Sequence, residues 1–131
     1  MLAKVLRRSR CVFVDDILNQ TYANFEFIIV NDGSTDETAQ ILESYAKQDP
    51  RIRVFDKENG GTGSALNHGF RQARGEFGTW VSSDDNKQPN YLEVLVSVLK
   101  KNRDIEFCCS AFYSAYSKKI FKPFHFKTQY N

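Results

Sequence analysis

An apolar stretch that stops abruptly in polar residues constrains the fold of this chain most strongly. It reads FEFIIVNDGSTDET, from Phe25 to Thr38. The β-branched and aromatic residues up to Val30 are typical of a buried strand. Asn31, Asp32 and Gly33 follow at once, and such residues favour turns and polar sites. We therefore predict a buried strand whose carboxyl end reaches the rim of a site.

Strand-like and helix-like segments alternate along the rest of the chain. The expected strands are Phe25–Asn31, Ile52–Asp56, Phe77–Ser82 and Ile105–Phe112. Three helices are expected. The first follows a capping box of Ser34 and Glu37, the second spans Ser64–Arg74 with Leu66, Phe70 and Ala73 inward, and the third begins at Asn90. This alternation predicts an α/β fold, a mostly parallel sheet with helices on both faces.

Size and composition exclude several classes of protein. A chain of 131 residues is expected to form one domain with a real core. The net charge of +2 is too small to indicate a nucleic-acid partner. No segment approaches the roughly 20 apolar residues that cross a bilayer. Cys11, Cys108 and Cys109 fit neither a metal spacing nor a disulfide framework. We therefore expect a cytoplasmic protein without a transmembrane segment.

The polar residues gather where the expected strands end. After the strands come NDGS, then DKENGGTGSALN, then SSDDN. In parallel sheets ligands bind beyond the carboxyl ends of the strands. The three loops are therefore expected to form one site.

Two of these loops each allow two interpretations. Asp32, when ionised, only accepts hydrogen bonds, so it suits a ligand edge with N–H donors such as the imide of uracil. It could equally brace the turn, with Gly33 at positive φ. The glycines of Asn59–Gly69 could bring backbone N–H groups to phosphate, or form a flexible turn. This loop has neither a P-loop ending nor a GxGxxG pattern.

The third loop carries two adjacent carboxylates, Asp84 and Asp85. Hard oxygen ligands of this kind suit Mg²⁺ or Mn²⁺ that is also held by substrate phosphates. A solvated turn is the alternative. A divalent cation is therefore the cofactor that the sequence favours.

Taken together, three segments resemble family 2 glycosyltransferases of the GT-A fold. They read ILNQTYANFEFIIVNDGSTDET, ENGGTGSALNHGFRQARGEF and TWVSSDDNKQPNYLE, and the match covers about Asp16 to Lys101. The resemblance implies a Rossmann-like nucleotide-sugar-binding fold, with residues 1–131 as the donor-binding half. It also implies a hexosyltransferase that moves sugar from a nucleoside diphosphate sugar to a hydroxyl of a glycan or other acceptor.

The resemblance also assigns residues. Asp32 stands where the family reads the nucleobase, and Asp84 stands at the last acid of its Asp-x-Asp motif, the metal ligand. Asp85 is a second candidate for Mn²⁺ or Mg²⁺, and Asn59–Asn67 would lie under the diphosphate and base. The implied donor-binding residues are Asp32, Gly33, Asn59, Gly60, Gly61, Asn67, Ser82 and Asp84.

The sequence departs from the family pattern at three places. Ser82 replaces the first acid of the metal motif, so binding is expected to be weaker. Nothing in residues 1–11 resembles the first strand that should precede a helix around Val12–Asn19, so Phe25–Asn31 is expected to have an unpaired edge open to oligomerisation. No residue in 107–131 is acidic, which leaves the catalytic base unassigned. The chain is therefore expected to be truncated at both ends; the alternative function is a non-catalytic nucleotide-sugar-binding domain or an inactive fragment.

Overall fold

The computed structural model describes residues 2–5, 12–82, 85–108, 110, 112–114 and 119–121. The chain divides into two compact units, Met1–Leu92 and Glu93–Asn131. The second unit contains most of helix α4 (Tyr91–Lys101) and an antiparallel pair of strands, β5 (Phe112–Ser114) and β6 (Lys119–Phe121). The assignment of residues 1–131 to a single domain stays a prediction.

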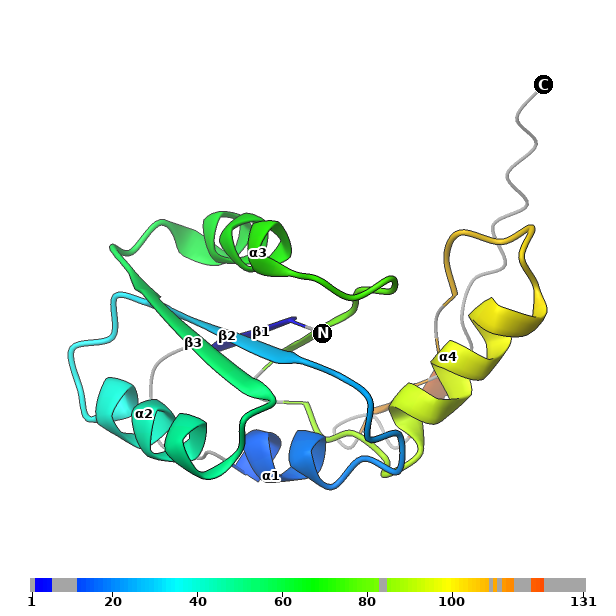
Figure 1. The fold of residues 1–131 in the computed structure, drawn as a ribbon, viewed down its shortest axis with the longest axis horizontal. Helices are drawn as coiled ribbons and strands as arrows, with labels where there is room; N and C mark the ends of the chain where they lie inside the picture. The colour runs from blue at the N-terminus through cyan, green and yellow to red at the C-terminus, as the bar shows by residue number, and fades with distance from the viewer. Residues whose placement is uncertain are drawn as a thin grey trace. The chain divides into compact units, whose positions relative to one another are not determined.

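The first unit is built on a four-stranded parallel sheet (Figure 1). Its strands are β1 (Leu2–Val5), β2 (Phe27–Asp32), β3 (Ile52–Lys57) and β4 (Trp80–Ser82). They lie in the order β3-β2-β1-β4. The predicted α/β fold with a parallel sheet is confirmed.

Strand β1 corrects one expectation from the sequence. Residues 2–5 pair in parallel with β2, from Leu2 opposite Ile28 to Val5 opposite Asn31, and β4 lies on the other side of β1. The first strand is therefore present, and β2 has a partner on each side. The expected open edge at Phe25–Asn31 is wrong. Four residues that include a lysine give too weak a local pattern, because their strand conformation depends on pairing with distant segments.

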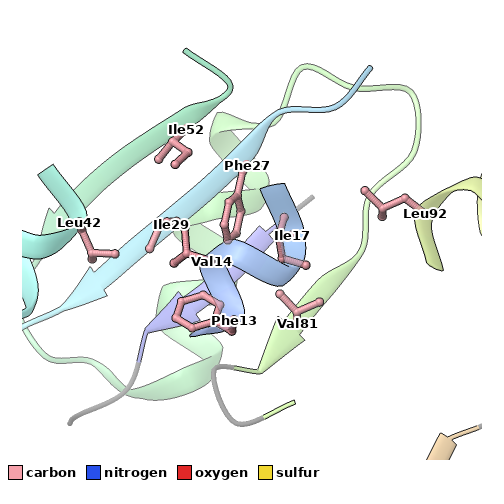
Figure 2. Packing of buried hydrophobic residues seen from close by; sticks show 9 residues of the cluster. All are labelled: Phe13, Val14, Ile17, Phe27, Ile29, Leu42, Ile52, Val81 and Leu92. Atoms are coloured by element: carbon pink, nitrogen blue, oxygen red, sulfur yellow. The ribbon is translucent and has the colours of Figure 1, made fainter. Parts of the chain in front are cut away.

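Helices cover both faces of the sheet, as predicted. Helices α1 (Val12–Leu18) and α2 (Thr38–Gln48) lie on one face and α3 (Gly61–Gln72) lies on the other (Figure 1). Figure 2 shows the larger core, which consists of Phe13, Val14, Ile17, Phe27, Ile29, Leu42, Ile52, Val81 and Leu92. A smaller cluster of Ile28, Val30 and Ala65 lies under α3. Successive residues of β2 thus alternate between two cores, which explains its uninterrupted apolar sequence.

Helix α2 begins later than the sequence suggested. The capping box of Ser34 and Glu37 is wrong, since α2 begins at Thr38 and its first residue is held by Asp36, whose carboxylate accepts from the Thr38 N–H at 3.1 Å. The Ser34 N–H instead donates to the Asn31 side chain at 3.1 Å. Ser34 therefore belongs to the turn that follows β2.

Other element boundaries also shift. Helix α3 buries Ala65 and Gly69, and Phe70 is 43% exposed, so the inward assignment of Phe70 is wrong. Small residues let the helix approach the sheet closely, which leaves the larger side chains at its margin. Residues 105–108 form no strand, contrary to expectation. The helices expected around Val12–Asn19 and from Asn90 are confirmed as α1 and α4.

Glu26, just before β2, ties the end of α3 to the sheet. Its carboxylate accepts from the backbone N–H groups of Arg74 and Gly75 and from Arg53 Nη1 at 2.8 Å. Burial acts to raise the pKa of Glu26, but hydrogen bonds from Arg74, Arg53 and Gly75 outweigh it and hold that pKa below its ordinary value of 4.5.

We expect Glu26→Gln to lower the free energy of unfolding at pH 7 by about 1–3 kcal/mol, since bonds to a charged acceptor are lost. Because the folded state depresses the pKa, the ionised form contributes stability above about pH 4.5, and this contribution is lost as the pH falls through the folded-state pKa. Urea titrations at pH 7 and pH 3 measure this, and the difference between the two proteins should be smaller at pH 3. The exposed Glu43→Gln is the control. An equal deficit at both values of pH would contradict the account.

Candidate functional site

The parallel sheet brings the carboxyl ends of its strands to one edge. In the register of the sheet, Asn31 lies opposite Val5 and Asp56, and Asp32 lies opposite Lys57. Ser82 ends β4 on the other side of β1. The polar residues predicted from the strand ends of β2, β3 and β4 therefore share this edge.

The carboxylate of Asp32 is the centre of the site. Its Oδ1 accepts from Lys57 Nζ at 2.8 Å and from the Gly60 N–H at 3.0 Å, and its Oδ2 accepts from the Gly61 N–H at 2.9 Å. The side chain is only 3% exposed. The partial positive charge of a helix N-terminus favours a carboxylate at this position. Asp32 therefore joins the end of β2 to the end of β3 and the start of α3.

Glycine is required where these two loops touch. Gly33 has φ +74°, and a Cβ added to it would lie 2.9 Å from the backbone nitrogen of Asn59. Gly61, the first residue of α3, has φ +80°. Any other residue at Gly33 would meet both backbone strain and a collision. The predicted residues Asp32, Gly33, Asn59, Gly60 and Gly61 are thus brought together.

The contacts bear on both sequence interpretations of these loops. From the sequence, the N–H groups of this loop were candidate donors to phosphate, and Asp32 was a candidate acceptor for a base. In the structure, the N–H groups of Gly60 and Gly61 donate to Asp32. Asp32 therefore braces a loop in this conformation, although it is the loop before α3 rather than its own turn. Asn67 is exposed and lies about 9 Å along the axis of α3 from Gly61.

Two residues that sequence reasoning missed support the site. Asn31 is buried; its Nδ2 donates to Asp56 Oδ1 at 2.7 Å, and its Oδ1 accepts the Ser34 N–H. Lys57 neutralises Asp32, and its side chain is 18% exposed. The position of Asn31, a polar residue within a buried strand, is the sequence signal that could have identified it. The role of Lys57 depends on the pairing of β2 with β3, which no local pattern reveals.

The residues expected to bind a metal ion lie only partly within the described residues. Asp84 lies outside the described residues. Ser82 is half-buried at the end of β4, and the exposed Asp85 pairs with Lys87 Nζ at 3.2 Å. Within the described part of the chain, no group of three or more His, Cys, Asp or Glu side chains could hold a metal ion. The described residues alone therefore do not form a metal centre.

No helix in the described ranges is long and apolar enough to cross a bilayer.

Comparison with known proteins gives consistent results. The family model described as Glycosyl transferase family 2 matches residues 11–130. An uncharacterized glycosyltransferase of Rickettsia typhi is 46% identical over 98 residues, which is 73% of this chain and 30% of that protein. The putative glycosyltransferase EpsH of Bacillus subtilis is 42% identical over 95 residues, 72% of this chain and 28% of that protein. Glycosyltransferase GlyG of Streptococcus pneumoniae is 45% identical over 94 residues, with 70% and 31% covered. The chain thus matches less than a third of the length of each.

Asn31→Asp tests the support beneath the site. The substitution replaces the amide that donates to Asp56 by a second carboxylate at a distance of 2.7 Å. Repulsion between like charges and the lost bond should lower the free energy of unfolding by about 1–3 kcal/mol at pH 7. Urea unfolding measures the effect, and adding Asp56→Asn should restore much of the loss because one acceptor becomes an amide. A double variant no more stable than Asn31→Asp would show that this pair is not the cause.

Proposed function

Since the chain belongs to glycosyltransferase family 2, we propose that it forms the donor-binding part of an enzyme that transfers a sugar from a nucleoside diphosphate sugar to an acceptor hydroxyl. The observation that carries this proposal is the carboxylate of Asp32, held at the end of the doubly covered strand β2 against the glycine loop before α3. The strand fixes the carboxylate because β2 is packed on both faces and paired on both edges.

In this proposal Asp32 recognises the nucleobase of the donor. An ionised carboxylate accepts hydrogen bonds and donates none, so it selects a base edge that presents N–H groups. Gly33 and Asn59 bring the two loops into contact beside it. Recognition of the base by such rigid elements orients the diphosphate and the sugar for reaction.

The transfer itself breaks the bond between the anomeric carbon and the diphosphate oxygen and forms a bond from that carbon to the acceptor oxygen. The electron pair of the broken bond leaves with the diphosphate. The proton of the acceptor hydroxyl passes to a general base. No residue of this chain is assigned that role, and the hexosyl donor, glycan acceptor and cytoplasmic location stay predictions.

We also propose that Mn²⁺ or Mg²⁺ assists the site. The support is the resemblance of Ser82-Ser83-Asp84 to the family motif, with Asp84 as the ligand; Asp85 is the second candidate, because related members shift the acidic pair by one residue around an Asp-Asp-Asn string. Donor phosphates commonly complete such a site, so one carboxylate from the chain suffices. When bound, the ion would neutralise charge on the leaving diphosphate.

Asp32→Ala should weaken the binding of nucleoside diphosphates. Losing one hydrogen bond to a charged acceptor is worth about 1.5–3 kcal/mol, or about one to two decades in affinity. Isothermal calorimetry with uridine and guanosine diphosphates measures this on protein shown to be folded by circular dichroism. The exposed Asp104→Ala is the matched control. If inorganic pyrophosphate binds as tightly as the nucleotides, or if Asp32→Ala binds like the wild type, Asp32 does not read the base.

A pair of variants tests the metal. Asp84→Ala should remove the enhancement of nucleotide binding by Mn²⁺, whereas Asp85→Ala should retain most of it. Calorimetry with and without Mn²⁺ gives the ratio of affinities for each protein. The opposite result would make Asp85 the ligand, and a wild type indifferent to Mn²⁺ would refute the metal proposal. Acceptor-dependent product from radiolabelled donors would separate a transferase from the non-catalytic alternative.

A further inference from the structure

The carboxylate that the donor would need is already covered by the chain itself. A ligand N–H must approach an oxygen of Asp32 to about 3 Å to form a hydrogen bond. The side chain is only 3% exposed, and Lys57, Gly60 and Gly61 all donate to it. A base can therefore reach Asp32 only after one of these groups has moved away.

Lys57, Gly60 and Gly61 differ in how easily they can leave Asp32. The N–H groups of Gly60 and Gly61 belong to the backbone at the start of α3, and that helix is fixed by Ala65 and Gly69 buried against the sheet. Moving them means moving the helix. The third donor is the terminal nitrogen of a flexible side chain, which can swing out by rotation about its own bonds. Lys57 is therefore the group that can exchange.

We propose that Lys57 is an affinity-determining residue that competes with the donor for Asp32 Oδ1. The inference rests on the proposed function. In the free protein the ammonium group neutralises the buried carboxylate. When the donor binds, its base takes over the hydrogen bond, and the ammonium turns toward solvent. One hydrogen bond replaces another, and no covalent bond changes.

The ammonium group lies directly against the loop before α3. A Cβ added to Gly60 would lie 2.9 Å from Lys57 Nζ and 2.7 Å from Ser64 Oγ. Lys57 also donates to the backbone oxygen of Glu58. By contrast Lys47, in its surface pair with Glu43, is 73% exposed. The contact between Lys57 and Asp32 is thus an enclosed interaction rather than a chance pair of surface charges.

With competition of this kind, the measured association constant equals the intrinsic one multiplied by the fraction of molecules in which Asp32 is accessible. Removing the ammonium group raises that fraction. We expect Lys57→Met to bind uridine or guanosine diphosphate about tenfold more tightly than the wild type. Binding of inorganic pyrophosphate, which has no base, should not change. Lys57→Arg keeps the charge and should stay near the wild type, as should the control Lys47→Met.

Isothermal calorimetry on the 131-residue chain, with each variant first shown to be folded, decides the matter. Lys57→Gln, which keeps a donor without the charge, is the second variant and should also bind the nucleotide more tightly. Equal or weaker nucleotide binding by Lys57→Met and Lys57→Gln, with a wild type that binds, would overturn the inference and leave the proposed function intact. Weaker pyrophosphate binding in these variants would overturn it too, because Lys57 would then be a phosphate ligand. Unfolding of both variants would show a purely structural pair, and no binding by any protein would refute the proposed function itself.

Discussion

A buried carboxylate surrounded by N–H donors holds the site of this protein together. Asp32 connects three separate parts of the chain, the ends of β2 and β3 and the start of α3, through bonds to Lys57, Gly60 and Gly61. Removing a carboxylate from water is costly unless opposite charge and hydrogen bonds replace the solvent. Here a lysine and a helix N-terminus supply both. The positions of the glycine loop and of α3 therefore depend on this one side chain.

The sheet explains why Asp32 can serve as a fixed point. Strand β2 lies between β1 and β3 and is covered by α1 and α2 on one face and by α3 on the other. Glu26 at the amino end and Asp32 at the carboxyl end of this strand hold opposite ends of α3. The helix is thus attached to β2 at both of its ends, and the loop that leads into it has little freedom to shift.

The sequence predicted those features that depend on consecutive residues. The uninterrupted apolar sequence of β2 and its polar end identified the central strand and the rim of the site. Strand β1 was missed because its short segment becomes a strand only through pairing with β2 and β4. Phe70 was misplaced because close packing of Ala65 and Gly69 turns it outward. The role of Lys57 could not be predicted, since it follows from the register that sets Lys57 opposite Asp32.

Amide hydrogen exchange, followed by nuclear magnetic resonance, tests the central interaction most directly. If the Asp32 carboxylate accepts the N–H groups of Gly60 and Gly61, these two amides should exchange slowly in the free protein. In Asp32→Ala their protection should fall about tenfold or more, the equivalent of one lost hydrogen bond, while the amides of Ala65 and Gly69 within α3 keep theirs. Equal exchange of Gly60 and Gly61 in the two proteins would contradict the account.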